Sequence, residues 1–292
     1  MKIIMFHYVV PSFNYYHFDL SLFEKIIKKL VSQYKVISIK EFDYFVKNNQ
    51  KLDDNYFMLT FDDGTIDHYK YVYPILKKYN CSGLFFIPSS FKNKKVLDIQ
   101  LIHNLISLVS IDELISDITY FCQKFNFDIM KFNENILYKL KDEKISFVKS
   151  LLQYKIPENI RIKLLDYLCD KYKISKNVND YYMNEIQMKE MKNNNMFFGI
   201  HTVNHKRLEK LNKKNQYYEI KNNLFDLQSF ELLDKNLYVI AYPFGSYNDE
   251  TISILKELNF AYGFKVNETN KISNLEINRI DCNCLKGDKF YE

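Results

Sequence analysis

Two adjacent carboxylates, Asp62 and Asp63, directly follow an almost unbroken apolar run at residues 56–61, and Gly64 comes next. Such a run is typical of a strand buried on both faces, and parallel sheets bind ligands where their strands end. The two acids could therefore act on a substrate or bind a cation. An Asp-Gly sequence after a strand can equally form only a turn or cap the next helix, so other residues must decide.

Two histidines, His201 and His205, stand four residues apart after a second apolar stretch at residues 196–200. If the chain turns helically here, both imidazoles lie on one face and can bind one ion. Two histidines with one carboxylate are an established zinc set that leaves one position open for water. Asp63 can supply that carboxylate. The histidine pair alone is weak evidence, but it shares a predicted sheet edge with the aspartates.

The elements that must position these residues alternate between strands and helices. Helical spacing of apolar residues predicts covering helices, the first capped by Asp19 or Ser21 and the second opened by a capping box of Ser38 and Glu41. Parallel strands with intervening helices and polar residues at the strand ends predict an α/β barrel. We expect its strands near residues 3–10, 36–39, 56–61, 84–87, 196–200, 237–245, 261–266 and 275–281.

Residues 92–176 differ from their flanks, since apolar residues recur there at helical spacing with lysine-rich polar faces between them. We interpret this stretch as a helical insertion within a single domain of residues 1–292. It holds no cluster of reactive side chains. We expect His103 to be a packed or surface residue, and we expect the insertion to contribute no catalytic group.

Composition limits the classes of partner. A net charge of +5 over 292 residues, without a dense basic block, argues against nucleic acid. No stretch is apolar and long enough to predict a transmembrane segment. The amino-terminal run is short, contains His7 and lacks a cleavage site, so we expect a first strand rather than a signal peptide, and a cytoplasmic protein.

The five cysteines do not form the pattern of a disulfide framework, and reduced thiols fit the expected cytoplasmic location. Cys282 and Cys284 could in principle bind a metal ion. On a strand their side chains share one face, but no second pair is present to complete a tetrahedral site. We therefore expect structural thiols.

Three segments resemble the principal motifs of the polysaccharide deacetylases, also called NodB-homology or carbohydrate esterase family 4 enzymes. They are residues 60–64 (TFDDG), 201–205 (HTVNH) and 242–245 (YPFG). The resemblance extends roughly over residues 1–90 and 181–281, on both sides of the insertion. It implies a distorted (β/α) TIM-like barrel of the NodB type, with about seven strands, and a metal-dependent amidase acting on N-acetylated sugars.

The resemblance also implies roles for individual residues. Asp63, His201 and His205 match the metal ligands of the family, most often for Zn²⁺ with Co²⁺ or Ni²⁺ as alternatives, and Asp62 matches its catalytic base. The backbone amide of Phe244 is expected to stabilise the oxyanion. The residues expected on the substrate side of the site are Tyr242, Pro243, Phe244 and Thr202, of which Thr202 is expected to orient the histidine loop rather than react.

One departure from the family pattern concerns an arginine. The family often carries it two residues before the proline of the third motif, where it orients the catalytic aspartate, but this chain has Ala241. Arg279 is our candidate for a substitute cation. A solvated arginine at a strand end is an equally good interpretation.

The general acid must also be found elsewhere, because the chain has no histidine after His205, whereas much of the family uses one near the carboxyl terminus. Residues 5–9 resemble the amino-terminal segment of the poly-N-acetylglucosamine deacetylase branch, which carries the acid's motif at the front of the chain. His7 also falls at the carboxyl end of a predicted barrel strand. The alternative is a histidine that is merely hydrogen-bonded within a strand.

Together these observations predict an N-deacetylase of a sugar or glycan precursor, which releases acetate and leaves a free amine, in cell-surface polysaccharide biosynthesis. One alternative is the same barrel hydrolysing another acyl bond, such as a formamide, a cyclic imide or an O-acetyl ester. Another is a non-catalytic carbohydrate-binding protein, which is expected to have lost its base or its ligands. Oligomeric state, the sugar and its carrier are not predicted.

Overall fold

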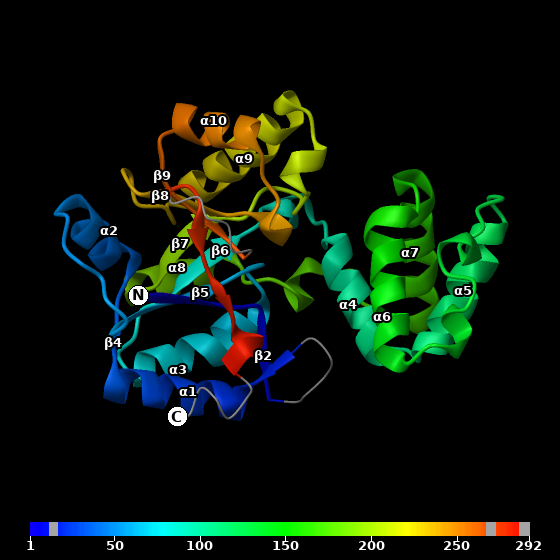
Figure 1. The fold of residues 1–292 in the computed structure, drawn as a ribbon, viewed down its shortest axis with the longest axis horizontal. Coiled ribbons are helices and arrows are strands. Elements are labelled where there is room, and N and C mark those ends of the chain that lie inside the picture. Colours follow the sequence, from blue (N-terminus) through cyan, green and yellow to red (C-terminus); the bar gives the residue numbers. More distant parts are fainter. Residues whose placement is uncertain (12–16, 267–272, 286–292) are drawn as a thin grey trace. The chain divides into compact units, whose positions relative to one another are not determined.

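The computed structural model describes residues 1–11, 17–266 and 273–285. The chain forms two compact units: a barrel unit, made of the described residues up to Asn93 and from Tyr182 onward, and a helical unit, Lys94–Tyr181. Figure 1 follows the chain through both units. The barrel unit contains every residue for which the sequence predicts a chemical role.

The barrel unit is built on parallel strands in the order β10-β9-β8-β7-β6-β5-β1-β11. A further short strand, β4 (Lys35–Val36), pairs with β5, while β2 (Tyr8–Val10) and β3 (His17–Asp19) form a separate pair. The strands of the barrel are β1 (Lys2–Phe6), β5 (Tyr56–Phe61), β6 (Leu84–Ile87), β7 (Phe197–Ile200), β8 (Tyr238–Ala241), β9 (Phe260–Lys265), β10 (Ile277–Asn278) and β11 (Ile280–Asp281).

A single short stretch of chain closes the barrel. β10 pairs with β9, β11 pairs with β1, and only Arg279 lies between β10 and β11. The Arg279 N–H donates to the carbonyl of Lys265 at 3.0 Å, which continues the ladder with β9. The nearly closed ring of parallel strands confirms the predicted distorted (β/α) barrel.

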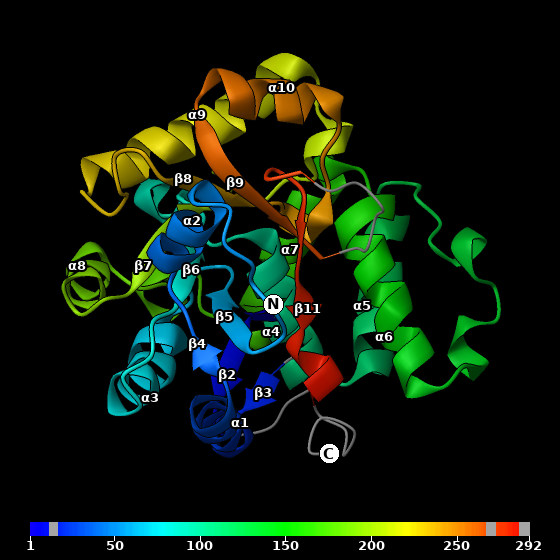
Figure 2. The same ribbon diagram turned by 60° about the vertical axis from the view of Figure 1, so that its left-hand side comes forward.

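Helices cover the outside of this ring, as Figure 2 shows for α1, α3, α8, α9 and α10. The predicted caps are confirmed, since Asp19 accepts the first helix's Leu22 N–H at 2.8 Å and Ser38 forms a capping box with Glu41. The helices of the barrel unit are α1 (Leu20–Gln33), α2 (Ile39–Lys47), α3 (Tyr73–Lys78), α8 (Glu185–Asn193), α9 (Lys213–Ser229) and α10 (Asp249–Glu257).

Alternating strand residues belong to two separate apolar cores. Ile4 and Phe85 pack with residues of the outer helices, whereas their neighbours Ile3 and Phe86 pack with apolar residues of the other strands and of α2. Because successive side chains of a strand point to opposite faces, the second core fills the inside of the barrel. The inside is therefore packed, and only the ends of the strands can hold a polar site.

The helical unit has its own apolar core, made by α4 (Asp98–Leu108), α5 (Ile111–Gln123), α6 (Lys141–Ser150) and α7 (Glu158–Tyr172). Its limits, Lys94–Tyr181, lie within a few residues of the predicted insertion at 92–176. Among all the described residues, no helix is both long and apolar enough to cross a membrane.

Several local expectations are wrong. The strands expected at residues 36–39 and 237–245 end at Val36 and Ala241, because Ile39 begins α2 and Pro243 begins a 3-10 helix. The strand expected over residues 3–10 is interrupted at His7, where β1 ends and β2 begins a different sheet. Cys282 and Cys284 lie in a 3-10 helix, Cys282–Leu285, rather than on a strand, so one thiol is buried and the other exposed. None of the five cysteines, all of them among the described residues, is in a disulfide, which agrees with the expectation that they form no disulfide framework.

Gly199 provides a test of the packed interior. A β-carbon at this position would lie 2.7 Å from the Phe86 ring and 2.7 Å from Val239, both in the inner core. We expect Gly199→Ala to lower the free energy of unfolding by about 1–3 kcal/mol through overpacking, as measured by urea denaturation. Ser82→Ala, a half-buried loop substitution, should change it by less than about 0.5 kcal/mol. Equal stability of both variants would contradict a filled interior.

Candidate active site

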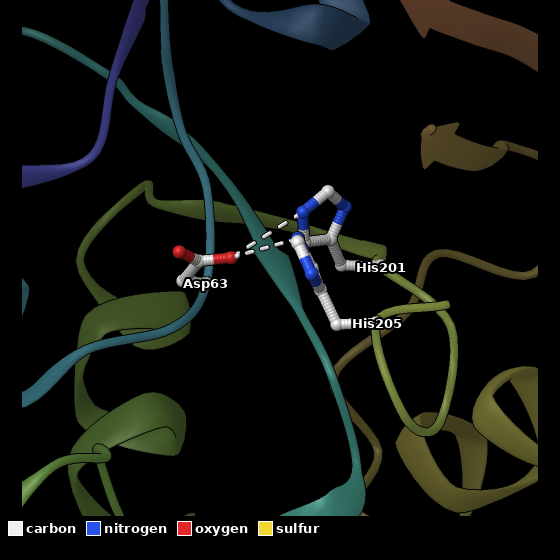
Figure 3. Close-up of side chains that lie close together, drawn as sticks. All are labelled: Asp63, His201 and His205. Carbon is white, nitrogen blue, oxygen red and sulfur yellow. Dashed lines mark ion pairs between the residues drawn. The ribbon is translucent and has the colours of Figure 1, made fainter. Parts of the chain in front are cut away.

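Three buried side chains converge where strands β5 and β7 end. The Nε2 atoms of His201 and His205 each lie 3.4 Å from the same oxygen, Oδ1 of Asp63. One ligand atom from each residue lies within 4.8 Å of the others. Figure 3 shows both imidazoles directed at the carboxylate. The structure thus brings together the three residues that the sequence suggested as ligands.

The spacing of these atoms fits a zinc-sized ion. Ligand atoms placed at about 2.1 Å from an ion in a tetrahedron are about 3.4 Å apart, which is the distance found here between each histidine nitrogen and the carboxylate oxygen. A carboxylate and two imidazoles are also a donor set that zinc accepts. The residues present therefore fit a divalent metal.

The electrostatics of Asp63 and His205 agree with that donor chemistry. Burial opposes the charge on Asp63, yet the neighbouring His205 and His201 hold its pKa well below its usual range, so it is a carboxylate. Burial lowers the pKa of His205 to about 4, so this imidazole is neutral at pH 7. For His201, burial is outweighed by the hydrogen bond that its ring donates to the Asp63 carboxylate, and the pKa is raised. A bound cation needs the neutral form of both imidazoles.

A second layer of contacts orients His201. Its Nδ1 lies 2.8 Å from the carbonyl oxygen of Ala241 on β8, which can only accept a hydrogen bond. Nδ1 therefore carries the proton in the neutral imidazole, and Nε2 offers its lone pair to the site. This partner is a backbone atom and does not depend on the side chain at position 241.

The backbone explains how two adjacent acids serve one site. Successive residues of a strand point to opposite faces, which would separate the carboxylates of Asp62 and Asp63. Asp63 has a φ of 74° and Gly64 has a φ of 62°, so the chain leaves the strand through two left-handed residues. This turn directs Asp63 to the histidines while Asp62 stays on the inner face of the barrel. For a non-glycine residue such a conformation costs on the order of 1–3 kcal/mol.

The expectation of a helical turn at residues 201–205 is wrong. These residues form a loop, in which Thr202 has a φ of 64° and His205 a φ of 52°. The two imidazoles face one site because the loop folds back, with ring centroids 4.8 Å apart, and not because they lie one helical turn apart. The two histidines therefore lie together as predicted, but the folded loop and not a helical turn brings them there.

Asp62 is held by Arg279. NH1 and NH2 of the guanidinium donate to Oδ1 and Oδ2 of Asp62, both at 2.7 Å, and NH1 also reaches the Thr60 hydroxyl at 3.2 Å. Arg279 is only 4% exposed, so it is not a solvated strand-end residue. Burial alone would raise the pKa of Asp62, but the Arg279 charge outweighs it and lowers the pKa below the usual value. Arg279 thus makes the contact that Ala241 cannot make.

The side chains of the third motif are largely buried. Tyr242 is fully buried and its hydroxyl donates to the Leu275 carbonyl at 2.6 Å, and Pro243 is also buried. Thr202 is fully buried as well. Tyr242, Pro243 and Thr202 are thus all buried. Their assignment to substrate binding stays a prediction. Phe244 is half-buried, has a φ of 59°, and packs its ring on His205 at a centroid distance of 4.7 Å.

His7 follows directly after β1 and is half-buried. Its positive charge, when present, is among the influences that lower the pKa of Asp62 and of Asp63, which places the imidazole within electrostatic reach of both acids. The Nε2 atom of His68 lies 2.6 Å from the His7 carbonyl oxygen and so anchors the backbone at this point. The structure therefore brings His7 to the same end of the barrel as the acids.

Sequence reasoning missed several residues that surround the site. The Arg207 guanidinium lies 5.0 Å from the centre of the Phe244 ring. Glu219 and Asn223 of α9 are hydrogen-bonded to the histidine loop. Their spacing of four on a helix was visible in the sequence, but it is also typical of an exposed polar face.

A family model described as polysaccharide deacetylase matches residues 49–106 and 127–263, which is more than half of the chain. The chain belongs to the polysaccharide deacetylase family. The match includes the three motifs and, beyond the resemblance noted in the sequence, much of the helical unit. His7 and Arg279 lie outside it. No curated protein sequence matches the chain.

Several solved structures share the fold. The Streptococcus pyogenes deacetylase PplD in complex with acetate is 22% identical, with 96% of this chain and 91% of that chain covered and a TM-score of 0.59. IcaB from Ammonifex degensii is 16% identical, with 96% and 90% covered and a TM-score of 0.57. A de-N-acetylase from Aggregatibacter actinomycetemcomitans is 17% identical, with 96% and 93% covered and a TM-score of 0.60.

The pair of Asp62 and Arg279 gives a test of the site's stability. We expect Arg279→Ala to lower the free energy of unfolding by about 3–5 kcal/mol at pH 7, because it leaves a buried carboxylate without its partner. Chemical denaturation measures this loss. The double variant Asp62→Leu with Arg279→Met removes both charges and should recover much of the stability. A loss below about 1 kcal/mol in Arg279→Ala would contradict a buried pair.

Proposed function

We propose that the chain is a divalent-metal-dependent N-deacetylase, which hydrolyses the acetamide of an N-acetylated sugar or glycan precursor to acetate and a free amine. The observation that carries the proposal is the buried set of Asp63, His201 and His205 beside Asp62, which is ion-paired to Arg279. Membership in the polysaccharide deacetylase family supports the reaction class.

Asp63, His201 and His205 would hold the metal, with one coordination position open to solvent or substrate. A zinc ion bound there would lower the pKa of a coordinated water to about 7 and polarise the acetamide carbonyl. Co²⁺ or Ni²⁺ could take the same place.

Asp62 would act as the general base. Arg279 occupies one lone pair on each of its oxygens, and an ionised carboxylate has about four such sites, so the carboxylate can still accept a proton. Arg279 also fixes the carboxylate plane and keeps it ionised. Asp62 would therefore take the proton of the attacking water, while its neighbour Asp63 is engaged with the histidines.

The remaining two steps need a hydrogen-bond donor for the oxyanion and a proton donor for the leaving amine. The backbone N–H of Phe244 would serve the oxyanion, a role supported by the contact of the Phe244 ring with His205 and by the left-handed conformation of this residue. His7 follows β1, which pairs with β5 on the side away from β7 and its histidines. His7 would give a proton to the leaving nitrogen.

The substrate class rests on similarity and on the chemistry of the site. Among proteins of this fold, one structure is described as a de-N-acetylase and another as a deacetylase in complex with acetate. We extend an N-acetyl substrate to this chain on that basis. A role in cell-surface polysaccharide biosynthesis and a cytoplasmic location stay predictions.

The reaction is tested by incubating the purified protein with N-acetylated sugars and oligosaccharides in the presence of zinc, cobalt or nickel. We expect acetate and free amine to appear in equal amounts, and chelation to abolish both. Release of formate from N-formyl sugars without any acetate release would instead assign the barrel to a different acyl bond.

Substitutions should separate the ligands from the base. We expect His205→Ala to lose bound metal and activity together, since it removes one of three ligands. Asp62→Asn should retain metal and lose turnover by about 10²–10⁴-fold, as expected for removal of a general base. Metal analysis and acetate assays on the same samples measure both, with His103→Ala of the helical unit as an unaffected control. Unchanged metal content in His205→Ala would overturn the ligand assignment.

The role of His7 is tested by changing the leaving group. An amide nitrogen must be protonated as it leaves, whereas an activated aryl ester departs without a proton. We expect His7→Ala to keep its metal, to lower amide hydrolysis by about 10²–10⁴-fold and to change ester hydrolysis little. Equal losses on the two substrates would show that His7 positions the substrate or the backbone instead.

A further inference from the structure

Helix α9 (Lys213–Ser229) buries two polar side chains beside the site, although neither belongs to a recognised motif. Glu219 is 5% exposed and Asn223 is fully buried. Buried carboxylates and amides need hydrogen-bond partners, because leaving them unpaired is costly. The partners of both residues lie in or next to the loop that carries His201 and His205.

Asn223 joins the ends of two strands. Its Oδ1 accepts the backbone N–H of His201 at 2.8 Å, and its Nδ2 donates to the carbonyl of Ile87, the last residue of β6, at 3.1 Å. The His201 N–H also lies 3.2 Å from that same carbonyl. Asn223 therefore fixes the point at which the chain leaves β7 and the first histidine begins.

Glu219 holds the middle of the loop. Its Oε2 accepts the backbone N–H of Asn204 at 2.7 Å, and its Oε1 accepts from the Asn204 side chain at 2.8 Å. Its backbone carbonyl accepts the Val203 N–H at 3.2 Å. One residue of the helix thus satisfies two successive amides between the two histidines.

The loop needs such support because of its backbone conformation. Thr202 has a φ of 64° and His205 has a φ of 52°, and a β-branched residue rarely adopts a left-handed conformation. Residues in such conformations persist only when surrounding contacts hold them. The placement of His205 relative to His201 depends on the three residues between them, two of which are bound by Glu219.

We infer that Glu219 and Asn223 are positioning residues of the metal site, which act by fixing the histidine loop so that both imidazoles face Asp63. The inference rests on the proposed function, since it assigns these residues to the same metal centre. Neither side chain is a ligand itself, because each is hydrogen-bonded to the loop's amides. The alternative is that they only attach α9 to the barrel.

The two interpretations differ in what happens to metal affinity. We expect Glu219→Ala and Asn223→Ala to weaken Zn²⁺ binding by about 10–100-fold, the usual effect of removing groups that orient ligands. Competition with a chromophoric chelator measures this affinity. Bound Co²⁺ should also show an altered visible absorption spectrum, because the ligand geometry changes. If the two residues only attach α9 to the barrel, neither the Zn²⁺ affinity nor the Co²⁺ spectrum should change.

The same helix offers a matched control. Gln216 is fully buried and is hydrogen-bonded to the Leu211 carbonyl and the Thr251 hydroxyl, away from the histidine loop. Gln216→Ala should lower the melting temperature of the metal-free protein yet keep the affinity for Zn²⁺ and the Co²⁺ spectrum. Glu219→Gln should fall between Glu219→Ala and the unsubstituted protein, because its amide oxygen can still accept one hydrogen bond.

Asn204→Ala addresses the case in which the helix variants fail to fold, because it leaves α9 untouched and removes a half-buried side chain. We expect it to weaken Zn²⁺ binding roughly 2–10-fold, as for the loss of one hydrogen bond. Unaltered Zn²⁺ affinity and Co²⁺ spectra in folded Glu219→Ala and Asn223→Ala would overturn the inference alone. If the unsubstituted, folded protein bound neither Zn²⁺ nor Co²⁺, the metal site of the proposed function would fail first.

Discussion

The buried ion pair of Asp62 and Arg279 is the constraint on which the site depends. A carboxylate buried at the end of a packed barrel needs a partner of opposite charge. The Arg279 guanidinium donates a hydrogen bond to each oxygen of Asp62. Arg279 is also the residue that separates β10 from β11, where the barrel closes. Closure of the ring, through the Arg279 backbone, and ionisation of the acid, through its guanidinium, are therefore linked through one residue.

A second constraint is the backbone conformation of the site. Asp63, Thr202, His205 and Phe244 all have positive φ angles, although none is glycine. Each such residue costs on the order of 1–3 kcal/mol, and only surrounding contacts can hold it in place. Hydrogen bonds from α9 hold the histidine loop, and the Ala241 carbonyl fixes the His201 ring. The strain concentrates where strand-end side chains must turn toward one point.

The sequence predicted the barrel because apolar runs and helical spacing are local properties. It also suggested the three residues that the structure brings together as candidate ligands, since Asp63 and the histidine pair follow such runs directly. It gave the wrong conformation for residues 201–205, because spacing alone cannot distinguish a helical turn from a folded loop. Glu219 and Asn223 were not predicted. Whether a polar helix face is buried depends on tertiary packing, which the sequence of the helix alone does not determine.

The arginine shows how a contact to Asp62 can come from outside the third motif. Ala241 belongs to the inner core, and Arg279 lies over the Phe86 ring of that same core, 5.4 Å from its centre. Both positions therefore face the inside of the barrel near its end. This space is filled by buried rings, so a long side chain at one position favours a small one at the other. The contact to Asp62 constrains where the guanidinium lies, and in this chain the residue between β10 and β11 supplies it.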